Sequence, residues 1–439
     1  MPILPSRRAF FGTFATGVAT QALTLGTGAL TARLLGPEGR GQFAGAQVWP
    51  GIVAMLALFG INNALSIRAA RDRGHKGIFE QKALRLGLPL SVFGAAIGWF
   101  AMPWLVPTSN PELLWLSRVM LIQVPLFALT SNLMAIDQGC GDFKQFNVAR
   151  NILTPVYLVL LVALWLAGVR EVIWFLGALL AANLAVLIYR LIVVKRDLSP
   201  GDAPANAELF RSGFPFWISG GVSILRDNAE RLLLMFLLGP SALGFYTVAF
   251  TASGAHLNIS RSLNLIVFSR SAALGGKSAL ADAARFFRMM GLMNVALGVI
   301  MVVAMPLLIR IVFGPSFGGA VKPAMLLVMA QLFLSQGAIL DEALRAQSRP
   351  YVGLIGMVCG MTVFAAVGSL IAKPLGLLGV AGASIAGQFA FWLWMVVSFR
   401  RIGGDVRLFP NRHDVAQLAR IARETKEALF SRLGTRPAA

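Results

Sequence analysis

Charged side chains are scarce in this chain of 439 residues, of which only 13% are Asp, Glu, Lys or Arg. Soluble domains carry roughly a quarter charged residues, so this composition argues against a soluble fold. Hydrophobic residues instead make up 57% of the sequence, and the mean hydropathy is +0.72. Apolar runs of about 18 residues or more recur along the chain, and each can cross a bilayer core of roughly 30 Å as a helix. The sequence therefore predicts an all-α polytopic membrane protein.

Acidic residues are the rarer charge type, because 19 Asp and Glu stand against 39 Lys and Arg, which gives a net charge of +20. In a soluble protein, such an excess would suggest a nucleic-acid partner. In a membrane protein, short cytoplasmic loops collect Lys and Arg. We therefore expect no nucleic-acid partner.

Cysteine and histidine are also rare, with two Cys and three His. Cys140 and Cys359 lie in different predicted helices with no metal-ligand or disulfide spacing, so we interpret them as packing residues. We expect no metal site and no cofactor. The sequence also lacks a phosphate-binding loop for ATP, and its predicted outer loops are too short for an external catalytic domain.

Apolar runs between turn and charge signals predict twelve membrane spans. The predicted spans cover residues 9–33, 43–67, 84–107, 113–138, 148–168, 171–193, 210–237, 243–267, 287–312, 323–346, 351–372 and 376–398. Connections on one side of the membrane, together with the C-terminal tail, carry 29 Lys and Arg, whereas those on the other side carry 6. By the positive-inside rule, this asymmetry predicts that both termini are cytoplasmic.

A Pro-, Gly- and Ala-rich linker at residues 197–209 divides the chain into two predicted six-helix bundles, residues 1–196 and 210–398. Residues 399–439 form a basic cytoplasmic tail with amphipathic character. One interpretation is a helix that lies on an anionic lipid surface. The alternative is a solvated tail with weak helicity.

A turn motif at the end of the first span recurs at the end of the seventh. Gly36, Pro37 and Gly41 match Gly239, Pro240 and Gly244 at a constant offset of 203 residues. Gly-Pro ends a helix because Pro lacks the N–H that a helix needs and Gly tolerates a left-handed cap. Duplication after six spans predicts two parallel halves related by a pseudo-two-fold axis along the membrane normal, with a substrate site in a central cavity.

The same residues carry a family resemblance. The chain resembles the polysaccharide exporters that flip lipid-linked oligosaccharides (O-antigen-type flippases) at Leu34–Phe43, Leu58–Ala64, Ala229–Tyr246 and Phe313–Phe317. Their superfamily also contains multidrug extruders and lipid II flippases. The resemblance implies a cavity that opens alternately to each side of the bacterial inner membrane. It also implies an undecaprenyl-diphosphate-linked oligosaccharide as cargo and coupling to H+ or Na+.

Two departures argue against lipid II as the cargo. Lipid II flippases usually have two further C-terminal spans, which are not predicted here. Their first helix also bears arginines, whereas the predicted first span has none before Arg33.

Four charged residues with no net charge lie in the predicted seventh span. They are Arg226, Asp227, Glu230 and Arg231. An ionisable group in a membrane span is costly unless it has a partner or faces a hydrated cavity. One interpretation is a pair of i,i+4 salt bridges that let the helix stay buried.

The other interpretation of the four charges is a cavity wall. The arginines would bind a diphosphate or acidic sugars, and Asp227 or Glu230 would exchange a proton or cation. At the offset of 203, the first span has Leu23, Thr24, Thr27 and Gly28 instead. We therefore predict that the ionic part of the site lies in the second half of the chain.

Other polar residues interrupt the predicted spans. Further candidates for substrate binding are His256, Asn258, Arg261, Asn264, Asn62, Asn63 and Gln331. For each of these residues the alternative is an interhelical hydrogen bond or, for Arg261, a side chain that reaches the interface. Asp137 and Asp341 end the equivalent spans four and ten, and we interpret them as candidate gating residues.

The sequence leaves three candidate functions. The favoured one is a flippase for a lipid-linked oligosaccharide, which is a transporter and not an enzyme, with a polysaccharide polymerase as a candidate partner. The second is a cation-coupled multidrug exporter of the same architecture, which ranks lower because cationic drugs favour acidic cavities. The third is a membrane-embedded polysaccharide polymerase or ligase, which the short outer loops disfavour.

Overall fold

The computed structural model describes residues 7–107, 110–194, 205–254, 276–347 and 349–404, together with residues 271 and 274, and these residues form helices without any strand. The helices are α1 (Arg7–Ala57), α2 (Ile61–Arg71), α3 (Lys76–Leu105), α4 (Pro111–Met120), α5 (Gln123–Cys140), α6 (Phe143–Leu166), α7 (Val172–Val193), α8 (Asn206–Leu237), α9 (Gly239–Ser253), α11 (Gly276–Leu308), α12 (Val321–Ala346) and α13 (Pro350–Arg401). Short helical turns at Arg73–His75, Ile309–Phe313 and Pro315–Ala320 connect them.

Two of these helices are each a pair of helices joined at a glycine. α1 breaks at Gly36, whose φ is 66°, and α13 breaks at Gly376, whose φ is 57°. Positive φ is strained for any residue with a Cβ, so glycine is needed at both breaks. Gly239, with a φ of 81°, separates α8 from α9 in the same way. The predicted Gly-Pro turns at the ends of spans one and seven are confirmed.

Seven of the described helices are long and apolar enough to cross a membrane, and eight when the bent pair of α1 and α2 is counted. The breaks at Gly36 and Gly376 divide α1 and α13 into two spans each. α8 is less apolar than these helices because it carries charged residues, and α9 is described over fifteen residues. When α1 and α13 are each counted as two parts and α8 and α9 are counted as spans, the described helices follow the predicted order of twelve spans.

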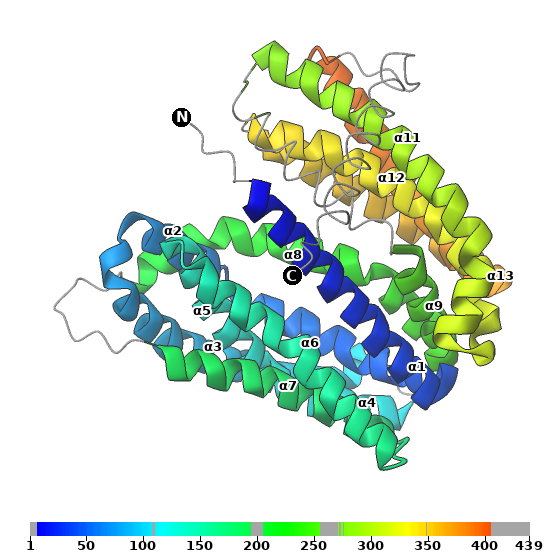
Figure 1. Ribbon diagram of the computed structural model, residues 1–439, viewed down its shortest axis with the longest axis horizontal. Helices are drawn as coiled ribbons and strands as arrows, with labels where there is room; N and C mark the ends of the chain where they lie inside the picture. Colours follow the sequence, from blue (N-terminus) through cyan, green and yellow to red (C-terminus); the bar gives the residue numbers. More distant parts are fainter. Residues whose placement is uncertain are drawn as a thin grey trace, which may run out of the picture.

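The helices form two lobes, α1–α7 and α8–α13, with separate hydrophobic cores. Figure 1 shows the helices of the lobes diverging from the corner where α1 and α9 meet, with the first part of α1 between them. The cores interlock at this corner. Ala32 and Ala44 of α1 pack in the core of the second lobe, and Met235 of α8 packs in the core of the first.

The repeated turn motifs contact each other at this corner. A Cβ on Gly41 would lie 1.7 Å from the carbonyl oxygen of Pro240, and a Cβ on Gly244 would lie 1.8 Å from that of Pro37. Both distances are far below van der Waals contact, so the backbones approach this closely only because neither residue has a side chain. This Gly41–Gly244 seam is symmetric, as expected for a contact across a pseudo-two-fold axis.

A second close approach joins the lobes further along α8. A Cβ on Gly60, which precedes α2, would lie 2.0 Å from the carbonyl oxygen of Gly213 in α8. Nearby, Trp217 Nε1 donates to the carbonyl oxygen of Leu56 at 2.9 Å, and its ring stacks on Phe59 with centroids 4.8 Å apart. The first half of α8 is therefore attached to the first lobe.

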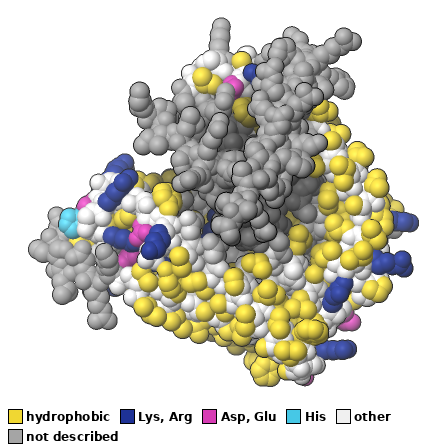
Figure 2. All heavy atoms as spheres, in the orientation of Figure 1, with side chains coloured by type: hydrophobic (Ala, Val, Ile, Leu, Met, Phe, Trp, Pro, Cys, Tyr) yellow, Lys and Arg dark blue, Asp and Glu magenta, His cyan; other side chains and the backbone are white. Residues whose placement is uncertain are grey.

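The outer surface of the helices is apolar. Trp104, Leu166 and Ile192 are 76–81% exposed, and hydrophobic side chains cover much of the face shown in Figure 2. Such exposure is unfavourable in water and favourable in hydrocarbon. The protein is therefore a multi-pass membrane protein.

Substitution of the seam glycines tests the contact between the lobes. We expect Gly41→Ala or Gly244→Ala to destabilise the protein by about 1–3 kcal/mol, because the new methyl group overlaps a backbone carbonyl. The measurement is the Tm of purified protein in detergent. Gly177→Ala is the matched control, since a Cβ there has nothing within 4 Å and Ala favours a helix over Gly. A Gly41→Ala variant as stable as the Gly177→Ala control would contradict the prediction.

Candidate functional site

α8 carries the charges predicted for the seventh span and contacts both lobes. It packs against α1 and α2 of the first lobe and against α9 and α13 of the second. The four charges of the predicted seventh span lie in its second half, after the contacts with Gly60 and Leu56.

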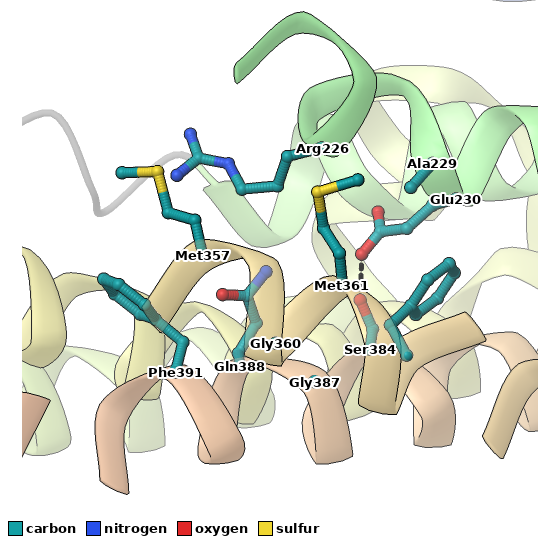
Figure 3. A pocket seen from close by; sticks show the side chains of 11 residues that line it. Arg226, Ala229, Glu230, Met357, Gly360, Met361, Ser384, Gly387, Gln388 and Phe391 are labelled. Carbon is teal, nitrogen blue, oxygen red and sulfur yellow. Dashed lines mark hydrogen bonds between the residues drawn. The ribbon is translucent and has the colours of Figure 1, made fainter. Parts of the chain in front are cut away.

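A small pocket lies between α8 and the two arms of α13, which are the helices before and after Gly376. Its lining residues are Arg226, Ala229, Glu230, Met357, Gly360, Met361, Phe364, Ser384, Gly387, Gln388 and Phe391. Figure 3 shows Glu230 reaching from α8 toward Ser384, whereas the side chain of Arg226 extends toward Met357. The two arms of α13 approach each other closely at Gly360 and Gly387, where a Cβ on either glycine would lie 2.8 Å from the other's carbonyl oxygen. These two glycines form part of the pocket wall.

The partners of Arg226 and Glu230 differ from a simple pair of i,i+4 salt bridges. Arg226 Nη2 lies 2.8 Å from Oδ1 of the adjacent Asp227, whereas Glu230 accepts a hydrogen bond from the hydroxyl of Ser384. Arg226 and Glu230 do share one helix face, as predicted, but that face lines the pocket. This geometry favours the cavity-wall interpretation for these two residues.

Asp227 and Arg231 point elsewhere. The side chain of Asp227 is 58% exposed. Arg231 is partly buried, and its Nη1 donates to Asn228 Oδ1 at 3.3 Å. On its other side, Arg231 acts electrostatically on Arg40 of α1. The four charges thus divide between the pocket, the exposed surface and the contact between the lobes.

Sequence reasoning missed several residues of this region. It assigned Arg40 to an outer loop, although its Nε is buried without a hydrogen-bond partner among the described residues. It also missed Ser384 and Gln388 in α13. Their spacing of four residues places them on one helix face, and this spacing could have indicated a polar face in an apolar span.

The remaining candidates for substrate binding are dispersed. His256, Asn258, Arg261 and Asn264 lie outside the described residues. Asn63 Nδ2 donates to the neighbouring Asn62 Oδ1 at 3.2 Å in half-buried α2. Gln331 of α12 is buried, and its Oε1 accepts no hydrogen bond from the described residues. None of these three described residues lines the pocket, and their roles stay predictions.

The two candidate gating residues have different surroundings. Asp341 is buried in α12, where Oδ2 lies 2.9 Å from Arg345 Nη2 and the carboxylate packs on the backbone of Gly353. Asp137 is fully buried at the end of α5, and the ion pairs found for it lie within the first lobe. A gating role for either residue stays a prediction.

Asp137 belongs to an ionic cluster that we had not expected. Lys76 Nζ lies 2.7 Å from Asp137 and 2.8 Å from Asp142, and Arg190 Nη2 lies 3.2 Å from Glu80 and 3.1 Å from Asp137. The hydrogen bond from Lys76 lowers the pKa of Asp142, in the turn between α5 and α6, below its usual value. The first half of the chain therefore also contains buried charges, whereas the placement of the ionic part of the site in the second half stays a prediction.

The cluster was not expected because its residues lie at the helix ends. Lys76 and Glu80 lie in the predicted cytoplasmic loop 68–83, and Arg190 lies near the cytoplasmic end of span 171–193, where charges are normally solvated. In the structure, the ends of α3, α5 and α7 converge, and Glu80 and Arg190 become 1% and 0% exposed. Hydropathy in one dimension contains no signal for this convergence.

The chain was compared with known families. The family model described as polysaccharide biosynthesis protein matches residues 6–269, which is more than half of the chain. The chain belongs to this family. No curated protein matches it.

Solved structures show which fold this polysaccharide biosynthesis protein adopts. An inward-facing multidrug resistance MATE transporter of the MOP superfamily matches with a TM-score of 0.71 at 16% identity, covering 87% of this chain and 95% of that one. The lipid II flippase MurJ, in an inward closed conformation, matches with a TM-score of 0.69 at 14% identity, covering 97% and 94%. A MOP transporter from Pyrococcus furiosus, described as having a binding pocket of reversed polarity, matches with a TM-score of 0.64 at 16% identity, covering 88% and 93%.

These likenesses establish the two-bundle fold of the MOP superfamily. Together with the family match, they support a membrane flippase or exporter. Within the described residues, no group of His, Cys, Asp and Glu is arranged to hold a metal ion.

Removal of Arg190 tests the ionic cluster of this family member. We expect Arg190→Ala to lower the free energy of unfolding by about 3–5 kcal/mol, because Glu80 and Asp137 would lose their shared cation while remaining buried. The measurement is an SDS titration in mixed micelles. Exposed Arg170 provides the control variant, Arg170→Ala.

The triple variant Glu80→Gln, Asp137→Asn, Arg190→Met removes the buried charges together and should be more stable than Arg190→Ala alone. Equal stability of Arg190→Ala and Arg170→Ala would show that the cluster does not stabilise the fold.

Proposed function

We propose that this protein is a flippase that moves an undecaprenyl-diphosphate-linked oligosaccharide across the bacterial inner membrane by alternating access. The observation that carries the proposal is the position of the arginines of α8, between diverging lobes, in a chain that belongs to the polysaccharide biosynthesis family. A diphosphate cannot cross roughly 30 Å of hydrocarbon without a polar path and a charge partner. Arg226 and Arg231 supply both.

The two arginines serve different surfaces of the path. Arg226 lines the pocket in the second lobe, where Gln388 and Ser384 offer hydrogen bonds to sugar hydroxyls. Arg231 faces the first lobe near Arg40. A guanidinium makes bidentate hydrogen bonds to phosphate oxygens, which suits a diphosphate shared between lobes.

Glu230 and Asp227 are the proposed coupling residues for H+ or Na+. Glu230 lines the pocket and accepts a hydrogen bond from Ser384, within a helix predicted to cross the membrane. Its charge is costly there, so binding of a proton or cation is favourable. Asp227 is exposed and pairs with Arg226, so it connects the pocket arginine to the surface.

The shape of the molecule supports an opening toward the cytoplasm. The Gly41–Gly244 seam lies at the ends of spans one and seven, which the asymmetry of Lys and Arg assigns to the outer side. The lobes diverge away from this seam (Figure 1). The TM-score is also higher for the inward-facing MATE structure, 0.71, than for an outward-facing one, 0.63. Both termini are then cytoplasmic.

A cation-coupled multidrug exporter is the second candidate, because MATE transporters are among the similar structures. Cationic drugs require acidic cavities, and the charged side chains that line this pocket are one arginine and one glutamate. The pocket therefore lacks the net negative charge that would select cationic drugs. A polysaccharide polymerase and an anionic lipid surface under the C-terminal tail are the further partners we propose.

Substitution of Arg231 tests the proposed cargo. We expect Arg231→Ala to reduce surface polysaccharide at least tenfold while lipid-linked precursor accumulates in the inner leaflet, because the diphosphate loses a charge-assisted hydrogen bond worth about 1.5–3 kcal/mol. The measurement is extraction of lipid-linked sugars from cells with equal protein levels. Exposed Arg310 gives the control variant, Arg310→Ala. Normal polysaccharide in the Arg231→Ala strain would contradict the assignment.

Neutral substitutions test the coupling residues. We expect Glu230→Gln to abolish the dependence of export on an ion gradient, since the amide binds neither a proton nor Na+. Asp227→Asn should weaken the dependence less, because that carboxylate is exposed and screened. The measurement is the rate of polysaccharide appearance with and without an uncoupler or an Na+ ionophore. Unchanged gradient dependence in both variants would rule out these two carboxylates.

A further inference from the structure

One bulky residue of the first lobe has a left-handed backbone conformation. Phe59 has a φ of 48°, and it is the one non-glycine residue with positive φ among those that the structure describes. In this conformation the Cβ of an L-residue lies too close to the following carbonyl oxygen, so the conformation is rare outside Gly, Asn and Asp. Such strain persists only where the surroundings hold the backbone in place.

The strain coincides with a break in the second predicted span. The sequence predicts one helix over residues 43–67, but α1 ends at Ala57, and α2 begins at Ile61 after a bend of 45°. Gly60, with a φ of 71°, weakens a helix without ending it. No proline lies between the two helices. The local sequence therefore does not account for the bend, and tertiary contacts must hold it.

α8 supplies these contacts through three aromatic rings. The ring of Phe59 stacks on that of Trp217, with centroids 4.8 Å apart. Phe210 meets the Phe59 ring edge-on at 5.4 Å, and Phe214 lies 6.5 Å away. The three rings of α8 recur at spacings of four and three residues, so they share one helix face. We call Phe59, Phe210, Phe214 and Trp217 the aromatic latch.

The carbonyl oxygen of Leu56 has a partner whether the segment is bent or straight. In the bent segment it accepts from Phe59 N at 3.2 Å and from Trp217 Nε1 at 2.9 Å. In a continuous helix it would accept from the amide of Gly60, four residues further on. An unpaired backbone group is costly within a membrane, and neither arrangement leaves this one unpaired. The segment can therefore change shape without that penalty.

The first half of α8 is attached to the first lobe through a small contact. Its buried residues are Leu209 and Gly213, whereas Phe214 is 45% exposed. An ion pair joins Arg68 of α2 to Glu208 of α8, but the side chains are 39% and 48% exposed, and exposed pairs contribute little. Apolar side chains that separate within a bilayer meet lipid instead of water. Release of this half of α8 therefore costs little.

The latch lies far from the Gly41–Gly244 seam. Most of the second part of α1 lies between Gly41 and Phe59, so the seam and the latch stand at opposite ends of that helix. Each joins α1 to the second half of the chain. Release of the latch while the seam stays closed would widen the gap between the lobes at the latch end.

We propose that the Phe59–Gly60 break is a strained hinge that the aromatic latch holds bent. When Trp217 withdraws, Phe59 leaves the left-handed region, α1 and α2 align as one helix, and the first half of α8 separates from α2. Relief of strain at Phe59 favours the released form, whereas the ring contacts favour the latched form. The hinge does not rest on the proposed function, although its part in transport does.

Distances between two spin labels test the hinge without any cargo. The labels are attached at Ala70→Cys in α2 and Arg211→Cys in α8, both exposed positions, with Cys140 and Cys359 replaced by alanine. Phe59→Ala and Phe59→Gly both remove the ring, but alanine keeps the strain and favours a helix, whereas glycine does neither. We expect the short, latched distance in wild type and in Phe59→Gly. The ratio of released to latched protein should be roughly tenfold higher in Phe59→Ala than in Phe59→Gly.

Substitution of Trp217 tests the latch from the side of α8. Trp217→Leu removes the stacked ring and the indole donor while the strain at Phe59 remains, so it should lengthen the distance between the labels. Trp174, which is 57% exposed in α7, gives the control variant Trp174→Leu, which should leave the distance unchanged. Equal distance distributions in Phe59→Ala and Phe59→Gly would overturn the proposal, and so would an unchanged distance in Trp217→Leu.

A cross-link tests the part of the hinge in transport. Arg68→Cys and Glu208→Cys together replace the ion pair between α2 and α8, so a disulfide between them should hold the latch closed. Cells with this variant should lose most of their polysaccharide export on oxidation and regain it on reduction, whereas each single-cysteine variant exports throughout. Normal export by the cross-linked protein would refute a role for release in transport. If the label distances change as expected but wild-type cells export no polysaccharide, the hinge stands and the proposed cargo is wrong.

Discussion

Backbone contact between Gly41 and Gly244 fixes how the two lobes meet, and the remaining architecture depends on it. Within a bilayer, no hydrophobic effect drives helices together, so close packing of small residues provides much of the attraction. Here the two copies of the Gly-Pro turn contact each other, with each glycine against the other copy's proline carbonyl. The lobes are therefore joined at this corner and, through the first half of α8, at Gly60, and their other helices diverge (Figure 1). A side chain at either position would push them apart.

Both lobes contain buried charges, and each compensates for them differently. In the first lobe, Arg190 and Lys76 bind three carboxylates directly, so the charges stabilise one another. In the second lobe, Glu230 has a hydroxyl partner and Arg226 a neighbouring carboxylate, and both line an open space. In the pocket, by contrast, Arg226 keeps N–H groups that could bind a larger polar molecule.

The sequence predicted the parts of the structure that depend on local chemistry. Hydropathy located the spans, and Gly36 and Gly239 located the turns, because a helix must end where Pro lacks its N–H and Gly adopts positive φ. Spacing also placed Arg226 and Glu230 on one face. It could not show that this face meets Ser384, 154 residues away, or that Arg190 meets Glu80, 110 residues away. Such pairs depend on tertiary packing, which a single sequence does not display.

α8 links the two lobes mechanically. Its first half is attached to α2 through Gly213 and Trp217, whereas its second half lines the pocket against α13. A helix held at both ends by different bodies must bend or slide when those bodies rotate relative to each other. We infer that a change in the angle between the lobes alters the distance between Glu230 and Ser384, and with it the charge state that the pocket favours. Movement of the lobes and binding in the pocket are then two aspects of one equilibrium, as the proposed alternating access requires.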